Sequence, residues 1–237
     1  MNDLDGLKLS AESIGLSNGE FEHIIVDGNS TDGSYEYAID LSSRSNTRVI
    51  KQRTHSIYGA FNEGLDESKG EYVIYLFCGD TMNIDTVKNL VKLYGQYDII
   101  ACSCTQRKDE GIKYYYRSER DEISVSSMSI LLSSLIVKLD KYKIVSGYDD
   151  NFKISADVDC ILKILKTACK IIYVDDIIVN MEEYGVSSDN YFKKIKEHTI
   201  IKYRHGSIVS AMIYIPKRLL FDFLIIPVWI QVKRALR

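Results

Sequence analysis

The sequence predicts an α/β domain with a mainly parallel, Rossmann-like sheet flanked by helices. Short apolar runs rich in β-branched residues alternate with helical segments along the chain, and the apolar runs are continuous rather than alternating. Continuous apolar strands are typical of parallel sheets that helices cover on both faces. The 237 residues are 46% hydrophobic and include only two prolines, so we expect one sizeable core without a proline-rich linker.

Each element follows from its local pattern. Residues 21–26 form an apolar run that predicts a strand, residues 34–43 have helical character, and residues 47–51 are extended again. A second helical segment covers 57–69 and precedes a fully apolar strand at 71–77. Within 83–94 apolar residues recur at spacings of three and four, which predicts an amphipathic helix, and 97–102 returns to a strand.

Composition excludes several classes of protein. The formal net charge of −3 and the pI of about 5.9 give no positive field for nucleic acid. The N-terminus is polar and does not resemble a signal peptide. The five cysteines contain no C-x-x-C pair, so we expect reduced, buried thiols in a cytoplasmic protein. The histidines lack metal-ligand spacing, which favours packing over a zinc site; they are His23, His55, His198 and His205.

The first acidic loop follows the strand at 21–26. Gly28 and Gly33 allow close backbone approach to a ligand, and Asp27 and Asp32 can accept hydrogen bonds from a nucleotide. An Asx-turn that starts the next helix is an equal alternative. A calcium loop is disfavoured because its sixth position is Asp32 instead of Gly and its twelfth is Ala38 instead of Glu.

The second acidic loop, at 77–83, contains Asp80 directly after a buried strand. In parallel sheets, ligands bind beyond the carboxyl ends of the strands, so both acidic loops fall at the predicted site. A lone carboxylate there suits Mg²⁺ or Mn²⁺ bound together with substrate phosphates. The alternative is a turn that precedes the helix at Asn83.

A third acidic cluster begins at Ser155, which suits the N-cap of a helix. Asp157 and Asp159 then lie in the first helical turn, where the helix dipole favours ionised carboxylates. This is either simple helix-start chemistry or a general base kept ionised at neutral pH.

Three segments appear in register: FEHIIVDGNSTDGS at 21–34, SIYGAFNEGLDESKGEYVIYLFCGDTMN at 56–83, and GYDDNFKISADVDCILKI at 147–164. Together they resemble the family 2 glycosyltransferases of the GT-A fold, most closely the branch that builds colanic acid, O-antigen and capsule polysaccharides. The resemblance spans about residues 2–190. It implies an inverting transfer of a sugar from a nucleotide-diphosphate donor, a UDP-sugar, to a hydroxyl of a glycan or lipid-linked oligosaccharide acceptor.

The resemblance also implies residue roles. Asp27, Gly28, Ser30 and Asp32 would bind the nucleotide, Asp80 would bind Mn²⁺ or Mg²⁺, and Asp157 would deprotonate the acceptor. Two further residues, Asn62 and Asp159, would lie on the acceptor or donor side.

The sequence departs from the family pattern at several places. The family's first strand is expected to be missing, because residues 1–14 match the segment after it. The family has a D-x-G just before the I-Y-D-A-x-N-K-G motif that the second segment resembles; here these three residues are Thr54, His55 and Ser56, and the motif's Asp and Lys are Gly59 and Glu63. The metal loop has Phe77 and Cys78 where an earlier Asp or Asn is usual. A non-catalytic sugar-nucleotide-binding or scaffolding remnant of the same fold is therefore the alternative function.

The C-terminus carries a different signal. Residues 213–237 combine a dense apolar run with Lys and Arg at its ends, and the apolar core is too short to span a bilayer. We expect a domain at 1–205 and C-terminal amphipathic helices at 206–237 that contact the inner face of the plasma membrane. The alternative is a terminal helix packed on the domain or in a dimer interface.

Overall fold

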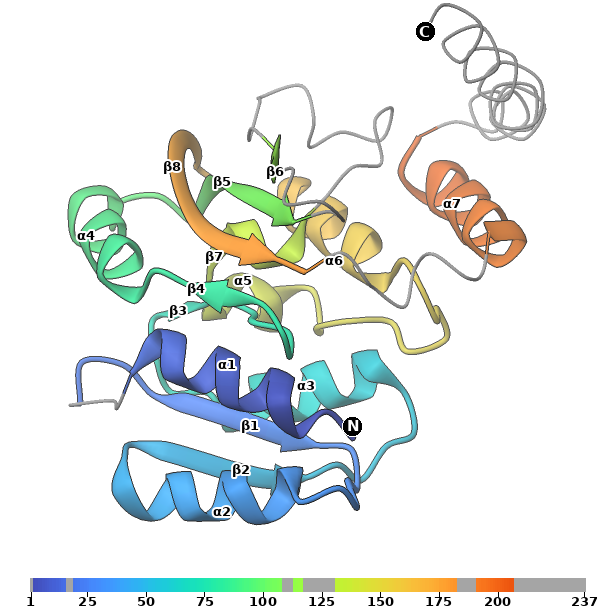
Figure 1. Cartoon of the computed structure of the whole chain (residues 1–237). Coiled ribbons are helices and arrows are strands. Elements are labelled where there is room, and N and C mark those ends of the chain that lie inside the picture. Colours follow the sequence, from blue (N-terminus) through green and yellow to red (C-terminus); the bar gives the residue numbers. More distant parts are fainter. Residues whose placement is uncertain (1, 16–18, 108–112, 117–130, 183–190, 207–237) are drawn as a thin grey trace, which may run out of the picture.

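The computed structural model describes residues 2–15, 19–107, 113–116, 131–182 and 191–206 (Figure 1). Helices and strands alternate through most of this range. In chain order they are α1 (Leu4–Ile14), β1 (His23–Asp27), α2 (Ser34–Arg44), β2 (Thr47–Lys51), α3 (Ile57–Glu67), β3 (Tyr72–Val73), β4 (Thr81–Met82), α4 (Ile84–Tyr94), β5 (Ile99–Arg107), β6 (Lys113–Tyr116), η2 (Leu132–Ser134), β7 (Leu135–Lys138), α5 (Leu139–Ile144), α6 (Ala156–Leu165), β8 (Ile171–Met181) and α7 (Tyr191–His205).

The described strands form two sheets. β1 and β2 make a parallel pair with His23 opposite Thr47, and the other sheet has the order β3-β7-β5-β8-β4, with β6 paired to β5. In Figure 1 the β1–β2 pair lies below the larger sheet, with α1 between them in this view. Within the described residues β1 pairs with β2 alone. The absence of the family's first strand stays a prediction.

The α/β class is confirmed, but the sheets are mixed rather than mainly parallel. β1–β2 and β5–β8 are parallel, whereas the described β3–β7, β5–β7, β4–β8 and β5–β6 pairs are antiparallel. The physical reason lies in the second half of the chain, where β7 enters the sheet between β3 and β5 with the opposite direction.

Most predicted elements agree with the structure within a few residues. The strand expected at 71–77 is an exception, because β7 pairs only with Tyr72 and Val73 and the following residues have no ladder partner among the described strands. The strand expected at 97–102 instead continues to Arg107, because β6 and β8 extend the ladder on both of its edges.

The core covers both faces of the larger sheet. Along β5, Ile99 and Ala101 pack with the α6 cluster, while Ile100 and Cys102 pack with the α4 cluster. This alternation follows from the two-residue period of a strand. α6 buries most of its length in the first cluster, so its N-terminus has a fixed place relative to the sheet.

Two expectations about the chain as a whole can be compared with the structure. All five cysteines are free, but Cys78 is exposed rather than buried. Among the described residues, no helix has the length and apolar character needed to cross a bilayer. The segment at 213–237, on which the membrane expectation depends, lies outside the described residues.

Candidate active site

Asp27 ends β1 and is buried, with 7% of its surface exposed. Its Oδ2 accepts a hydrogen bond of 3.0 Å from the backbone N–H of Ser30. The turn is completed by Asn29, whose φ of 64° lies in the left-handed region. Asn adopts this backbone conformation more readily than most residues other than glycine. One oxygen of Asp27 thus closes the turn after β1, and the contact of Asp27 with a nucleotide stays a prediction. Gly28 follows Asp27 directly and has no positive φ.

The rest of this loop is tied to the N-terminus of α1. Asp32 Oδ1 accepts bonds from the hydroxyl and the N–H of Ser34, and Oδ2 accepts one from the N–H of Leu4 at 3.0 Å. The Ser34 hydroxyl bond is the main reason why the pKa of Asp32 lies below its usual range. Ser30 Oγ in turn accepts from the N–H of Asn2 at 3.2 Å. The loop is thus held in one conformation by α1.

Asp80 lies in the second acidic loop and is also 7% exposed. Its Oδ1 accepts a bond of 3.0 Å from the backbone N–H of Glu182, which follows β8. Burial raises the pKa of Asp80 to about 6, and the nearby Glu182 carboxylate adds to this effect. The antiparallel pairing of β4 with β8 produces this proximity, since Thr81 stands opposite Asn180.

Gly79 shapes the same loop. Its φ of 90° favours glycine, and a Cβ at this position would lie 3.2 Å from Glu182 Oε2. Its N–H bonds to Ser10 Oγ at 3.1 Å, so α1 anchors the second acidic loop as well as the first.

The two acidic loops converge on Cys78. Although the Cys78 residue is exposed as a whole, partial desolvation of its thiol raises the pKa, and the carboxylates of Asp3, Asp27 and Asp80 lie close enough to raise it further. The two loops are thus close to one another, although β1 and β4 belong to separate sheets among the described residues. Within the described residues no three His, Cys, Asp or Glu side chains form a ready-made cation site. Asp80 and Glu182 together still offer the oxygen ligands that Mg²⁺ and Mn²⁺ prefer when most remaining ligands are phosphate and water.

Asp157 is the second residue of α6. Its Oδ1 accepts a bond of 3.2 Å from the hydroxyl of Tyr58 on α3 and one of 2.9 Å from the N–H of Val158. Burial raises the pKa of Asp157 to about 6, while these two bonds and the charge of Lys194 favour the ionised form. A carboxyl group with this pKa can accept a proton near neutral pH.

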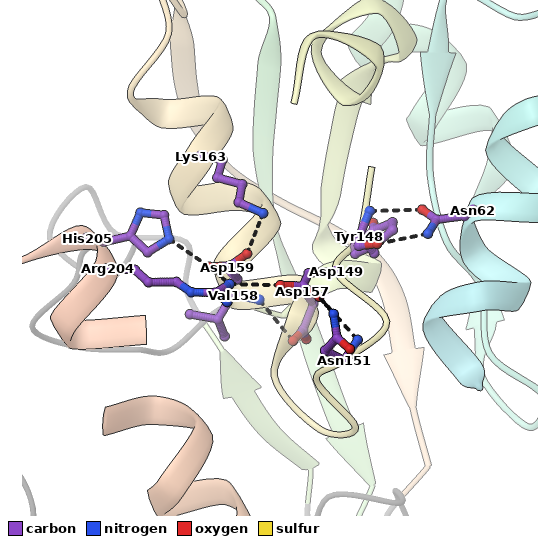
Figure 2. A network of polar contacts seen from close by, with 10 residues as sticks. All are labelled: Asn62, Tyr148, Asp149, Asn151, Asp157, Val158, Asp159, Lys163, Arg204 and His205. Carbon is purple, nitrogen blue, oxygen red and sulfur yellow. Dashed lines mark hydrogen bonds and ion pairs between the residues drawn. The ribbon is translucent and has the colours of Figure 1, made fainter. Parts of the chain in front are cut away.

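Asp159, two residues further on, has a different environment (Figure 2). It is fully buried, with Oδ1 2.8 Å from His205 Nε2 and Oδ2 2.7 Å from Lys163 Nζ. Burial acts to raise the pKa of Asp159, but the bond from His205 and the pair with Lys163 outweigh it and keep the pKa below its usual range. These contacts join α6 to α7 and favour a structural role. The acceptor- or donor-side role of Asp159 stays a prediction.

Asn62 on α3 forms a two-way bond with the backbone of Tyr148 (Figure 2). Its Nδ2 donates to the Tyr148 carbonyl at 2.9 Å and its Oδ1 accepts from the Tyr148 N–H at 2.8 Å. Because both the oxygen and the nitrogen of the Asn62 amide are engaged in this pair of bonds, hereafter the Asn62–Tyr148 bracket, the geometry favours a role of Asn62 in positioning the segment that leads to Asp157. A direct contact of Asn62 with substrate stays a prediction.

Sequence reasoning missed two neighbours of the predicted residues. Tyr58 is 99 positions from Asp157 and Glu182 is 102 positions from Asp80. Tyr58 lies within the segment at 56–83 that resembles the family, but a helical tyrosine more often packs in a core. Neither Tyr58 nor Glu182 has a sequence spacing that identifies it as the neighbour of a carboxylate. Only the tertiary fold brings these pairs together.

The chain is similar in sequence to known glycosyltransferases. The model of glycosyl transferase family 2 matches residues 7–162. Proteins named "PGL/p-HBAD biosynthesis glycosyltransferase" from Mycobacterium bovis and Mycobacterium tuberculosis are 29% identical over 83 residues, which cover 34% of this chain and 32% of each relative. The match thus spans about a third of the length of these curated relatives.

Solved structures share the fold at low sequence identity. TarS 1–349 of S. aureus in complex with UDP-GlcNAc matches with a TM-score of 0.68 at 14% identity, over 87% of this chain and 65% of that chain. The mannosyltransferase PcManGT from Pyrobaculum calidifontis, in complex with GDP-Man and Mn²⁺, matches with a TM-score of 0.58 at 15% identity, over 99% of this chain and 75% of that chain. The fold is therefore the α/β fold of nucleotide-sugar transferases, and the chain belongs to glycosyl transferase family 2.

Proposed function

We propose that this chain is an inverting glycosyltransferase that moves a sugar from a UDP-sugar to a hydroxyl of a glycan or lipid-linked acceptor. The observation that carries the proposal is Asp157, whose pKa of about 6 and hydrogen bond from Tyr58 suit a general base. TarS was solved with UDP-GlcNAc and PcManGT with GDP-Man, which supports a nucleotide-sugar donor. The mycobacterial relatives are named as biosynthesis glycosyltransferases, which supports sugar transfer in a biosynthetic role.

The transfer would proceed in one displacement. Asp157 accepts the proton of the acceptor hydroxyl, whose oxygen forms a bond to the anomeric carbon from the face opposite the diphosphate. The bond between that carbon and the diphosphate oxygen breaks, and its electron pair stays on the nucleoside diphosphate. Inversion follows from attack on the opposite face. No covalent intermediate with the protein is required.

The donor would lie over the two acidic loops. The first acidic loop is proposed to hold the nucleotide through Asp27, Gly28, Ser30 and Asp32. Asp80 and Glu182 would then lie beside the diphosphate. Asp80 and Glu182 would hold Mn²⁺ or Mg²⁺, which supplies positive charge next to the leaving diphosphate. The solved complex of PcManGT contains Mn²⁺, which supports this choice.

We also propose that the enzyme works at the inner face of the plasma membrane, in the assembly of bacterial surface polysaccharide such as colanic acid, O-antigen or capsule. Residues 213–237 support this proposal through their apolar run and basic ends. A lipid-linked acceptor would be presented at that surface.

The test is turnover of a panel of nucleotide sugars: UDP-Glc, UDP-Gal, UDP-GlcNAc and GDP-Man, each with Mn²⁺ and with water as the acceptor. Release of the nucleoside diphosphate is measured for the wild type and for Asp157→Asn. Turnover of at least one donor that Asp157→Asn abolishes supports the proposal. Binding of UDP without turnover of any donor would instead favour the non-catalytic remnant.

A further inference from the structure

Glu197 on α7 binds the backbone directly before the proposed base. Its carboxylate is buried, with 6% of the residue exposed. Oε1 accepts from the N–H of Lys153, and Oε2 accepts from the N–H groups of Ile154 and Ser155, each at 2.9 Å. One carboxylate thus binds three consecutive backbone N–H groups, and Asp157 lies two residues after the last of them.

This contact replaces the local means of fixing a helix start. Ser155 stands at the N-cap of α6, but its side chain makes no capping bond and its Oγ is buried without a hydrogen-bond partner among the residues that the structure describes. A negative charge is favourable at a helix N-terminus, where free N–H groups and the helix dipole point outward. The direction in which α6 begins therefore depends on a carboxylate from another helix.

The position of α7 is itself fixed against α6 at a second point. His205 at the end of α7 lies 2.8 Å from the buried Asp159, and Arg204 Nη1 pairs with Asp149 Oδ2 at 2.8 Å (Figure 2). α6 therefore gives a carboxylate to the end of α7, and α7 gives one to the segment before α6. With both contacts in place, Glu197 cannot shift without moving the start of α6.

Other groups around Asp157 come from two directions. The Tyr58 hydroxyl approaches from α3 with a bond of 3.2 Å to Oδ1. Lys194 acts on the same carboxyl from α7, one helical turn before Glu197. A change in the start of α6 would alter the distance to both, so the geometry of the base depends on the Glu197 contact.

We infer that Glu197 is a positioning residue for the transfer reaction, which holds Asp157 in place through the backbone of residues 153–155. The inference rests on the proposed role of Asp157 as the base. Glu197 would act on Asp157 only through this backbone, with which both of its carboxylate oxygens are engaged.

The variant Glu197→Gln keeps the volume of the side chain but has a single acceptor oxygen and places an NH₂ group against backbone N–H donors. Lys196→Ala is the matched control, because Lys196 is the exposed neighbour on the same helix. Both are compared with the wild type in the panel of UDP-Glc, UDP-Gal, UDP-GlcNAc and GDP-Man with Mn²⁺ and water. Titration with UDP gives the fraction of binding-competent sites, so kcat is expressed per competent site and partial unfolding does not affect it.

We expect Glu197→Gln to lower kcat per competent site by at least tenfold with the donor KM unchanged, and to speed hydrogen exchange of the amides at 153–155. Lys196→Ala should match the wild type in both. Unchanged kcat per competent site in Glu197→Gln, together with loss of turnover in Asp157→Asn, would overturn the Glu197 inference alone. Full turnover in Asp157→Asn, or no turnover of any donor by the wild type, would overturn the proposed function and this inference with it.

Discussion

The two halves of the candidate site hold their carboxylates in different ways. In the first acidic loop of the proposed donor half, the bonds of Asp27 and Asp32 include partners two or three residues away, Ser30 and Ser34, whereas Asp80 in the second loop depends on the distant Glu182. In the base half, Asp157 and Asp159 depend on distant elements: Tyr58 from α3 and His205 from α7. The first acidic loop is therefore largely a local structure that α1 reinforces, whereas the environment of the proposed base is assembled by tertiary packing. Substitutions in the two halves should differ in how far their effects spread.

The largest expected effect is on turnover in the base half. Asp157→Asn keeps the shape of the side chain but removes the proton acceptor, and loss of a general base lowers rates by about 10²–10⁴-fold. We expect this loss in kcat for the donor that the wild type uses best, measured as release of nucleoside diphosphate. Asp66→Asn, which changes an exposed carboxylate on α3, is the control and should keep the wild-type rate.

The second effect is on stability and compares Asp159 with Asp32. Asp159→Ala leaves the buried His205 and the Lys163 ammonium without their carboxylate, and breaking a buried pair costs about 3–5 kcal/mol. Asp32→Ala removes an exposed carboxylate and should have a much smaller effect. Urea denaturation of both variants measures the difference. Equal losses of unfolding free energy would contradict the contrast between the two halves.

The third comparison uses two glycines with positive φ. Gly33, at the N-cap of α2, has a φ of 94° and would place a Cβ 3.5 Å from Leu4, so Gly33→Ala should cost only the backbone strain, about 1 kcal/mol. Gly147 has a φ of 66° and would place a Cβ 2.4 Å from Asn62 Oδ1. Gly147→Ala should also break the bracket between Asn62 and Tyr148, for about 3 kcal/mol in total. Thermal or urea unfolding of the two variants side by side tests this order.

The smallest effect is a shift in pH dependence. The Tyr58 hydroxyl bonds to Asp157 and favours its ionised form, as do the Val158 N–H and the charge of Lys194. The proposed base is active when it is ionised, so kcat should rise as pH increases through about 6. Tyr58→Phe removes one favourable bond and raises the pKa, so the acid limb should move to higher pH by up to about one unit.

Asp80 titrates in the same pH range as Asp157, so the effects of protonating these two carboxylates on the rate must be separated. Its pKa is also raised to about 6 by burial. The profile is therefore recorded at saturating Mn²⁺ and donor, where protonation of Asp80 is suppressed. A Tyr58→Phe limb that coincides with the wild-type limb under these conditions would show that Tyr58 does not contact the base.

The sequence predicted much of the fold because local patterns determine it. The strand at 47–51 and the helix that begins after Asn83 follow from apolar runs, periodicity and capping residues, and the structure has both. The mixed direction of the larger sheet was not predicted, because the place of β7 between β3 and β5 depends on pairing between segments far apart in the chain.

The site was predictable to the same extent. Asp27, Asp80 and Asp157 stand out in the sequence because each was expected to follow a strand or start a helix, and their roles stay predictions; the structure places the first two near Cys78. Their distant partners, such as Glu182 and Glu197, could not be found from spacing. From the sequence, Glu197 would be assigned to the surface, because it lies in a helix rich in basic residues; its contact with residues 153–155 is visible only in the structure.

The central claim is that the donor half binds nucleotide and the base half performs the transfer. Calorimetric titration of UDP in the presence of Mn²⁺ tests it most directly when Asp80→Asn and Asp157→Asn are measured beside the wild type. The account predicts that Asp157→Asn binds UDP within about twofold of the wild type while Asp80→Asn binds at least tenfold more weakly, a difference of about 1.4 kcal/mol. Equal weakening in both variants, or full affinity in Asp80→Asn, would contradict the claim.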